Sequence, residues 1–140
     1  MKKILIVEDD QKIAMALMIR LKANGYNPSI AADAIAGASQ ARTMKPDLIL
    51  LDISMPGGNG FQLAETFLRM PETNGIPFVF ITASKNPDLE QKVLASGAAG
   101  LFEKPFDTEK LLNFIEANFK RAAGMLNARQ NSAAGKPYEL

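Results

Sequence analysis

Six polar residues of this sequence follow short apolar runs, and their types suit phosphate chemistry. They are Glu8, Asp9 and Asp10 after residues 4–7, Asp52 after residues 48–51, Thr82 after residues 78–81, and Lys104 after residues 101–102. Carboxylates are hard oxygen ligands, and with no His or Cys beside them they select Mg²⁺. Such an ion keeps several waters and binds through one or two carboxylates plus a phosphoryl oxygen.

A carboxylate can also act as the nucleophile of phosphoryl transfer when cations neutralise the phosphoryl oxygens. Asp52 stands alone behind its run, which suits that role, and Lys104 adds a positive charge. Each residue taken singly has a simpler explanation, because Asp and Thr often cap the helix that follows. Taken together the carboxylates would repel one another, so the set indicates a cation site.

The composition excludes several other kinds of chemistry. The 140 residues contain no histidine, which rules out a phosphohistidine carrier and a His-based hydrolase, and no cysteine, which rules out disulfides and thiolate zinc sites. The net charge of +1 gives no field that attracts nucleic acid or a membrane surface, so we expect no direct DNA binding. No apolar run reaches membrane-spanning length, and we expect a soluble cytoplasmic protein.

The elements that must position these residues alternate between strands and helices. Fully apolar runs at residues 4–7, 48–51 and 78–81 predict buried strands, and residues 29–32 and 101–102 predict weaker ones. Helical spacing between the runs predicts helices over residues 11–24, 34–44, 61–70, 88–96 and from 108 onward. Asp33 is expected to cap the second helix, and Gly25 and Gly97 to stop the first and fourth.

Five strand-then-helix units predict an α/β fold, doubly wound, with a parallel sheet and helices on both faces. In such a sheet ligands bind at the carboxyl ends of the strands, where the six polar residues stand. We expect a single domain over residues 1–121. Beyond about Ala122 the sequence turns small and polar, so residues 122–140 are expected to be a flexible tail, a linker or a cloning remnant.

Four of these strand ends carry motifs that resemble the receiver domains of two-component response regulators, of the chemotaxis-regulator type. The motifs are Ile4-Leu5-Ile6-Val7-Glu8-Asp9, Leu50-Leu51-Asp52-Ile53-Ser54-Met55-Pro56, Ile81-Thr82-Ala83 and Lys104-Pro105-Phe106. The resemblance covers roughly residues 2 to 121 in order and spacing, and four such motifs together are highly specific. It implies a flavodoxin-like (βα)5 fold with strand order 2-1-3-4-5.

The same resemblance implies a role for each site residue. Glu8, Asp9, Asp52 and the backbone carbonyl of Ser54 would hold Mg²⁺, and Asp52 would accept the phosphoryl group. Thr82 and Lys104 would contact its oxygens, the small Ala83 would leave the site open, and the Lys104-Pro105 peptide would be cis. The donor would be a histidine kinase or a histidine phosphotransfer protein, and the response would alter the surface of the fourth helix, fifth strand and fifth helix.

One position departs from the family pattern. Three residues before the lysine the family often has an aromatic side chain that rotates inward on activation, whereas this chain has Leu101. Whether the chain reads out its state through an aromatic switch is thus open, and movement of Thr82 could still repack the surface between the fourth and fifth helices. The downstream partner is expected to be a separate output protein or an output domain missing from this chain, and the protein to be a monomer or weak homodimer.

Two other functions remain open. A Mg²⁺-dependent phosphohydrolase also uses an aspartate behind the first strand, but it expects an Asp-x-Asp motif, whereas this chain has Glu8 first. A phosphorylation-independent interaction module is motivated by Leu101. Neither a Gly-x-x-x-x-Gly-Lys-Ser/Thr loop nor a Gly-x-Gly-x-x-Gly turn is present, which disfavours nucleotide binding. We expect a signalling phospho-acceptor rather than an enzyme.

Overall fold

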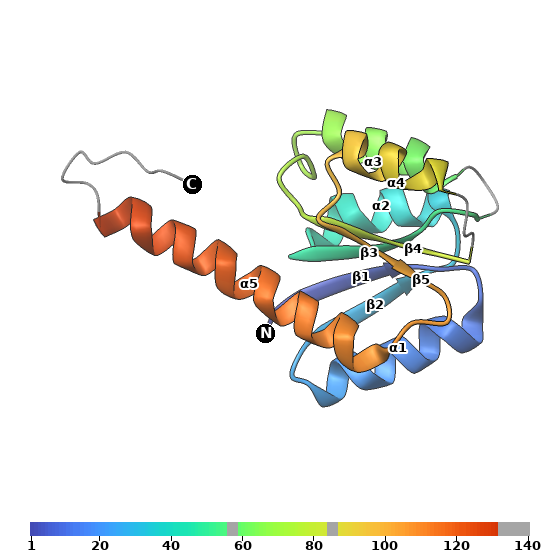
Figure 1. Cartoon of the computed structure of the whole chain (residues 1–140), viewed down its shortest axis with the longest axis horizontal. Coiled ribbons are helices and arrows are strands. Elements are labelled where there is room, and N and C mark those ends of the chain that lie inside the picture. The colour runs from blue at the N-terminus through green and yellow to red at the C-terminus, as the bar shows by residue number, and fades with distance from the viewer. Residues whose placement is uncertain (56–58, 84–86, 132–140) are drawn as a thin grey trace. The chain divides into compact units, whose positions relative to one another are not determined.

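The structure is a computed structural model that describes residues 1–55, 59–83 and 87–131. In this part of the chain every strand is followed by a helix (Figure 1). The elements are β1 (Lys3–Val7), α1 (Gln11–Ala23), β2 (Asn27–Ala31), α2 (Ala34–Met44), β3 (Leu48–Asp52), α3 (Gly60–Arg69), β4 (Phe78–Thr82), α4 (Asp88–Ser96), β5 (Gly100–Glu103) and α5 (Thr108–Asn131).

The strands form one parallel sheet in the order β2-β1-β3-β4-β5. The predicted fold class and strand order are confirmed. The direction in which strands are added to the sheet reverses between β1 and β3, because β2 lies outside β1 and the later strands are added on the other side. The carboxyl ends of β1 and β3 are therefore neighbours at the point where α/β sheets bind ligands.

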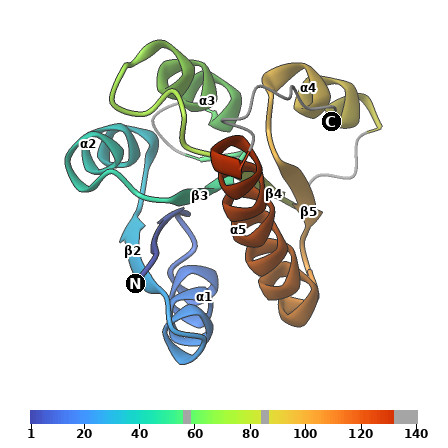
Figure 2. The same cartoon turned by 90° about the vertical axis from the view of Figure 1, so that its left-hand side faces the viewer.

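The chain divides into two compact units, Met1–Pro105 and Phe106–Leu140. Within the first unit, α2, α3 and α4 lie along one face of the sheet and α1 lies on the other (Figures 1 and 2). Alternation along the strands divides the apolar side chains between these faces. The face under α2 to α4 is packed by a cluster that includes Leu5, Val7, Ile49, Leu51, Phe67 and Phe80.

Three helix ends lie at the capping residues that the sequence indicates, one at an aspartate and two at glycines. Asp33 accepts a hydrogen bond from the backbone N–H of Ala36 at 2.8 Å and so caps α2. Gly25 and Gly97 follow α1 and α4 with φ angles of 87° and 81°, in the left-handed region that glycine adopts without strain. The three predicted helix boundaries are confirmed.

Two elements differ from the sequence-based expectation. β2 begins at Asn27 rather than near residue 29 and contains Pro28. It lies at the edge of the sheet, where a proline without an N–H is tolerated. α5 continues past Ala122 to Asn131, so part of the stretch expected to be an irregular tail is helical.

The division between residues 1–121 and 122–140 stays a prediction, and residues 132–140 lie outside the described residues. Among the helices in the described ranges, none combines the length and the apolarity needed to cross a membrane.

Candidate functional site

The ends of β1 and β3 bring the predicted acidic residues together. Val7 pairs with Leu51 in the parallel register, so the next residue of each strand, Glu8 and Asp52, projects from the same edge of the sheet. The backbone N–H of Glu8 continues the ladder with a 3.0 Å hydrogen bond to the carbonyl of Ala31. The strand pairing itself fixes the position of these two carboxylates.

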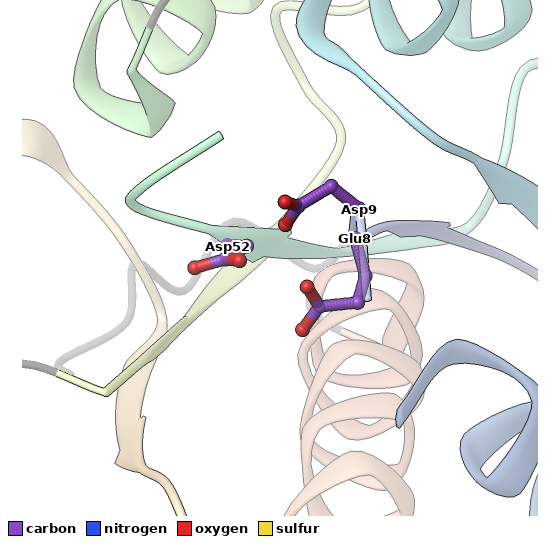
Figure 3. Close-up of side chains that lie close together, drawn as sticks. All are labelled: Glu8, Asp9 and Asp52. Atoms are coloured by element: carbon purple, nitrogen blue, oxygen red, sulfur yellow. The ribbon is translucent and has the colours of Figure 1, made fainter. Parts of the chain in front are cut away.

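Three carboxylates meet at this edge (Figure 3). Glu8, Asp9 and Asp52 each offer an oxygen within 4.8 Å of the other two. Glu8 and Asp52 are buried, with 1% and 4% of their surface exposed, whereas Asp9 is exposed. Buried carboxylates so close together repel one another strongly, and a divalent cation bound by oxygen ligands removes that repulsion. The donor set fits Mg²⁺, with Asp9 on the solvent side.

Lys104 supplies positive charge to this cluster. Its Nζ lies 2.6 Å from Glu8 Oε1 and 3.3 Å from Asp52 Oδ2, and its side chain is 15% exposed. Burial lowers the pKa of Lys104, but the contacts with Glu8 and Asp52 outweigh it and the pKa is raised. The ammonium therefore stays charged and bridges two carboxylates from different strands.

The electrostatic cost of the cluster falls on Glu8. The pKa of its carboxyl is raised to about 7, because burial and the neighbouring Asp52 raise it by more than the contact with Lys104 lowers it. The backbone N–H of Asp10 donates to Glu8 Oε2 at 3.1 Å. Glu8 Oε1 is buried, and it lies 2.6 Å from the ammonium of Lys104. A buried carboxylate oxygen that is paired only with a cation is suited to ligate a second one.

The Asp52 carboxylate is held from two sides. The backbone N–H of Ser54 donates to Oδ1 at 3.2 Å, and the ammonium of Lys104 donates to Oδ2 at 3.3 Å. Ser54 thus lies beside the cluster, as predicted, while its carbonyl as a metal ligand stays a prediction. Pro56, the last residue of this motif, lies outside the described residues.

Asp10 has a structural role and is not part of the cluster. Its side chain accepts hydrogen bonds from the backbone N–H groups of Lys12 and Ile13, at 2.9 and 3.3 Å, and so caps α1. The simpler explanation, helix capping, therefore holds for Asp10, although it stands next to Asp9 in the sequence.

Thr82 and Lys104 are brought side by side by the pairing of β4 with β5. Thr82 pairs with Glu103, and the backbone N–H of Lys104 donates to the carbonyl of Thr82 at 2.7 Å. Asp52 pairs with Ile81, which places Thr82 one residue beyond Asp52 at the same edge. Thr82 is buried, and Ala83 behind it is exposed.

The switch positions predicted from the resemblance lie on β5 and directly after it. The peptide between Lys104 and Pro105 is cis, as the resemblance implies. Leu101 is partly buried and packs against the apolar cluster under α2 to α4. An aliphatic side chain already rests where the family often has a mobile aromatic one.

Sequence reasoning missed the residues at the start of α3 that lie against the backbone of Asp52. α3 begins at Gly60, and its N–H donates to the carbonyl of Ile53 at 2.7 Å. A Cβ at Gly60 would lie 2.5 Å from the carbonyl oxygen of Asp52 and 2.8 Å from the Cα of Ile53, so only glycine fits there. Asn59 and Gln62 form a capping box at this helix start. Their three-residue spacing was the available signal, and nothing in the sequence marked the close approach of Gly60.

Comparison with known proteins agrees with this geometry. The family model for the response regulator receiver domain matches residues 4–116. Among curated relatives, the dual master transcriptional regulator RpaA of Synechocystis is 33% identical over 94% of this chain and 55% of its own length. The phosphate regulon regulator PhoB of Escherichia coli is 35% identical over 89% of this chain and 54% of its own length.

A solved structure shows the same fold. A CheY-like receiver domain protein from Methanospirillum hungatei is 27% identical, with a TM-score of 0.83 over 89% of this chain and 98% of that protein. The chain thus spans nearly all of that protein but only about half the length of the two curated relatives.

Proposed function

Since this chain belongs to the family of response regulator receiver domains, we propose that it is a phospho-accepting switch in which Asp52 takes the phosphoryl group. The observation that carries the proposal is the cluster of Glu8, Asp9 and Asp52 at the carboxyl edge of the sheet. Lys104 bridges the two buried members, Glu8 and Asp52. A set of acidic residues that served only as caps would not converge within 4.8 Å while two of them were buried.

In the proposed reaction an oxygen of Asp52 attacks the phosphorus of a phosphohistidine on the donor protein. An O–P bond forms as the N–P bond breaks, and the donor imidazole leaves. The Ser54 N–H and the Lys104 ammonium hold the two carboxylate oxygens before the attack, which fixes the direction of the nucleophile. After transfer, Lys104 and the hydroxyl of Thr82 each contact a phosphoryl oxygen.

Glu8, Asp9, Asp52 and the carbonyl of Ser54 would hold Mg²⁺. When bound, the ion neutralises the charge on the phosphoryl oxygens and on the carboxylates. The residues of the chain position the reacting groups. Glu8 keeps Lys104 directed into the site through the 2.6 Å ion pair, and the close backbone approach at Gly60 keeps Asp52 in place.

The test is transfer from a small phosphodonor. Incubation with acetyl phosphate and Mg²⁺ is expected to add one phosphoryl group, visible as a mass gain of the intact protein that survives mild acid. Asp52→Asn is expected to abolish the gain, and removal of the ion with a chelator to suppress it. Asp47→Asn is the matched control, because Asp47 precedes the same strand at its opposite end and should leave labelling unchanged. Full labelling of Asp52→Asn would remove Asp52 from this role.

The two alternative functions make different predictions. A phosphohydrolase would turn over small phosphate esters many times per protein. Asp10, the residue closest to the second aspartate of an Asp-x-Asp motif, is engaged in capping α1, which speaks against that reading. An interaction module would bind no Mg²⁺ and show no response to a phosphodonor.

Partners follow from the proposed switch. We propose that a histidine kinase or a histidine phosphotransfer protein supplies the phosphoryl group, and that a separate protein or a further domain carries the output. The relatives' names include transcriptional regulators, and this chain covers about half of their length. Location in the cytoplasm, weak dimerisation and a response at α4, β5 and α5 stay predictions.

A further inference from the structure

Phe61 lies at the start of α3, next to the glycine that contacts the backbone of the proposed phosphorylation site. The preceding residue, Gly60, approaches the backbone of Asp52 so closely that a single added carbon would lie 2.5 Å from its carbonyl oxygen. A hydrogen bond of 2.7 Å joins the N–H of Gly60 to the carbonyl of Ile53. With no free space at this contact, a shift of the backbone at Asp52 must move the first turn of α3 with it.

The side chain of Phe61 also contacts the strand that carries Thr82. Its ring centroid lies 4.9 Å from that of Phe80, with the ring planes tilted by 54°. Phe80 precedes Thr82 by two residues on β4 and meets Phe78 edge to face at 5.5 Å. Phe61 is therefore linked to both strand ends that the proposed reaction changes: to β3 through the backbone of its neighbour Gly60, and to β4 through its own contact with Phe80.

The outer side of Phe61 lines a groove between α3 and α4, which lie next to each other in Figure 2. The groove encloses about 410 Å³. Its lining includes Asn59, Phe61, Gln62, Leu68, Lys92 and Ser96. Lys92 of α4 reaches across it, with its Nζ 6.0 Å from the centroid of the Phe61 ring. That distance is the outer limit of a cation–π contact, so the link between the two helices is weak and easily changed.

The groove offers a route of response that does not use Leu101. We propose that Phe61 is a positioning residue that couples phosphorylation of Asp52 to the groove between α3 and α4, changing the contact of Phe61 with Lys92. The inference rests on the proposed function, because it requires Asp52 to be phosphorylated. Packed interiors change between discrete arrangements rather than deform smoothly, so a small shift at Asp52 is sufficient to rearrange a side chain fixed at two points.

The chain contains no tryptophan, which allows a single reporter to be placed in the groove. Leu68 lines the groove and is 47% exposed, so Leu68→Trp should fold. With acetyl phosphate and Mg²⁺, we expect the emission maximum of Leu68→Trp to shift. The shift should be lost when Phe61→Leu is added, while intact-mass spectrometry still detects the phosphoryl group. Ile35→Trp, at an exposed position in the separate groove between α2 and α3, is the control and should not respond.

Each outcome decides something. A phosphoryl mass gain without an emission shift in Leu68→Trp overturns the inference and leaves the proposed function intact. A shift that persists in Leu68→Trp with Phe61→Leu overturns the coupling role of Phe61. A response of Ile35→Trp equal to that of Leu68→Trp overturns its restriction to this groove. Absence of any mass gain overturns the inference together with the proposed function.

Discussion

The amino and carboxyl ends of strands β1 and β3 differ in how their charged groups are paired. At the amino end, the backbone N–H of Lys3 donates to Asp47 Oδ2 and the ammonium of Lys3 donates to the carbonyl of Met44, both at 2.7 Å. The lysine and the aspartate thus each have a well-matched partner. At the carboxyl end three carboxylates lie together, and the two buried ones, Glu8 and Asp52, share the ammonium of Lys104.

The two ends therefore differ in how well their charged groups are balanced. The amino end satisfies its polar groups in the way that buried and half-buried groups normally do. The carboxyl end retains an excess of negative charge in a buried place, where charge costs most. Such a cost is typical of functional sites, and it agrees with the cation and the phosphoryl group that we propose for this one.

The largest expected effect of this difference is on how the free energy of unfolding depends on pH. The Glu8 pKa is raised from 4.5 to about 7 in the folded protein. A carboxyl whose folded pKa is raised contributes stability that is fully present below the unfolded pKa and is lost as pH rises through the folded one. Without divalent ions, the free energy of unfolding should fall between pH 4.5 and about pH 7, by up to about 3 kcal/mol.

Urea denaturation at a series of pH values measures that loss. Glu8→Gln removes the titrating group and should flatten the profile over the same range. Asp47→Asn, at the amino end, should leave the slope unchanged. A profile of the unmodified protein that is flat between pH 4.5 and 7 would mean that the carboxyl end carries no buried electrostatic cost.

A second test concerns the lack of space at the carboxyl end. Gly60→Ala places a Cβ against the backbone of Asp52 and should lower the free energy of unfolding by about 2 kcal/mol, in the range usual for overpacking. It should also slow labelling of Asp52 by acetyl phosphate. Gly75→Ala is the matched control, since a Cβ there meets nothing within 4 Å. Equal stabilities of the two variants, from chemical denaturation, would show that the contact behind Asp52 is loose.

The smallest effects should differ in sign between the two ends. Asp52→Asn removes one buried charge from an over-acidic cluster and should stabilise the ion-free protein by about 1 kcal/mol. Asp47→Ala removes the acceptor of the Lys3 N–H and should destabilise it by about 1 kcal/mol. Thermal denaturation with a chelator present measures both. Destabilisation by both variants would contradict the contrast between the two ends.

Much of the site was predictable because it depends on strand ends. Apolar runs mark where the strands stop, and a parallel sheet brings those stops to one edge. Glu8, Asp52, Thr82 and Lys104 were found in this way. Asp10 could not be separated from Asp9 by type, because only the helix that starts at Gln11 turns one carboxylate into a cap and leaves the other beside the site.

Other features depend on distances that a sequence does not contain. The raised pKa of Glu8 comes from burial and from Asp52 on the neighbouring strand β3. The requirement for glycine at position 60 comes from the closeness of two backbones. The continuation of α5 to Asn131 was missed because we weighed the small polar composition of the stretch after Ala122, although Ala, Met, Leu, Arg and Gln in it favour helix.

The parallel register of β3 has a consequence for how this protein can change over evolution. Asp52 pairs with Ile81 while Leu51 pairs with Phe80, so the same hydrogen-bonded ladder sets the positions of Asp52 and of the core side chains. Inserting or deleting one residue within β3 would exchange the two faces of the strand, so its buried apolar side chains would leave their places in the core and Asp52 would lose its register with Ile81. Insertions and deletions should therefore be confined to the connections outside the strands, and the number of residues from Leu48 to Asp52 should stay constant.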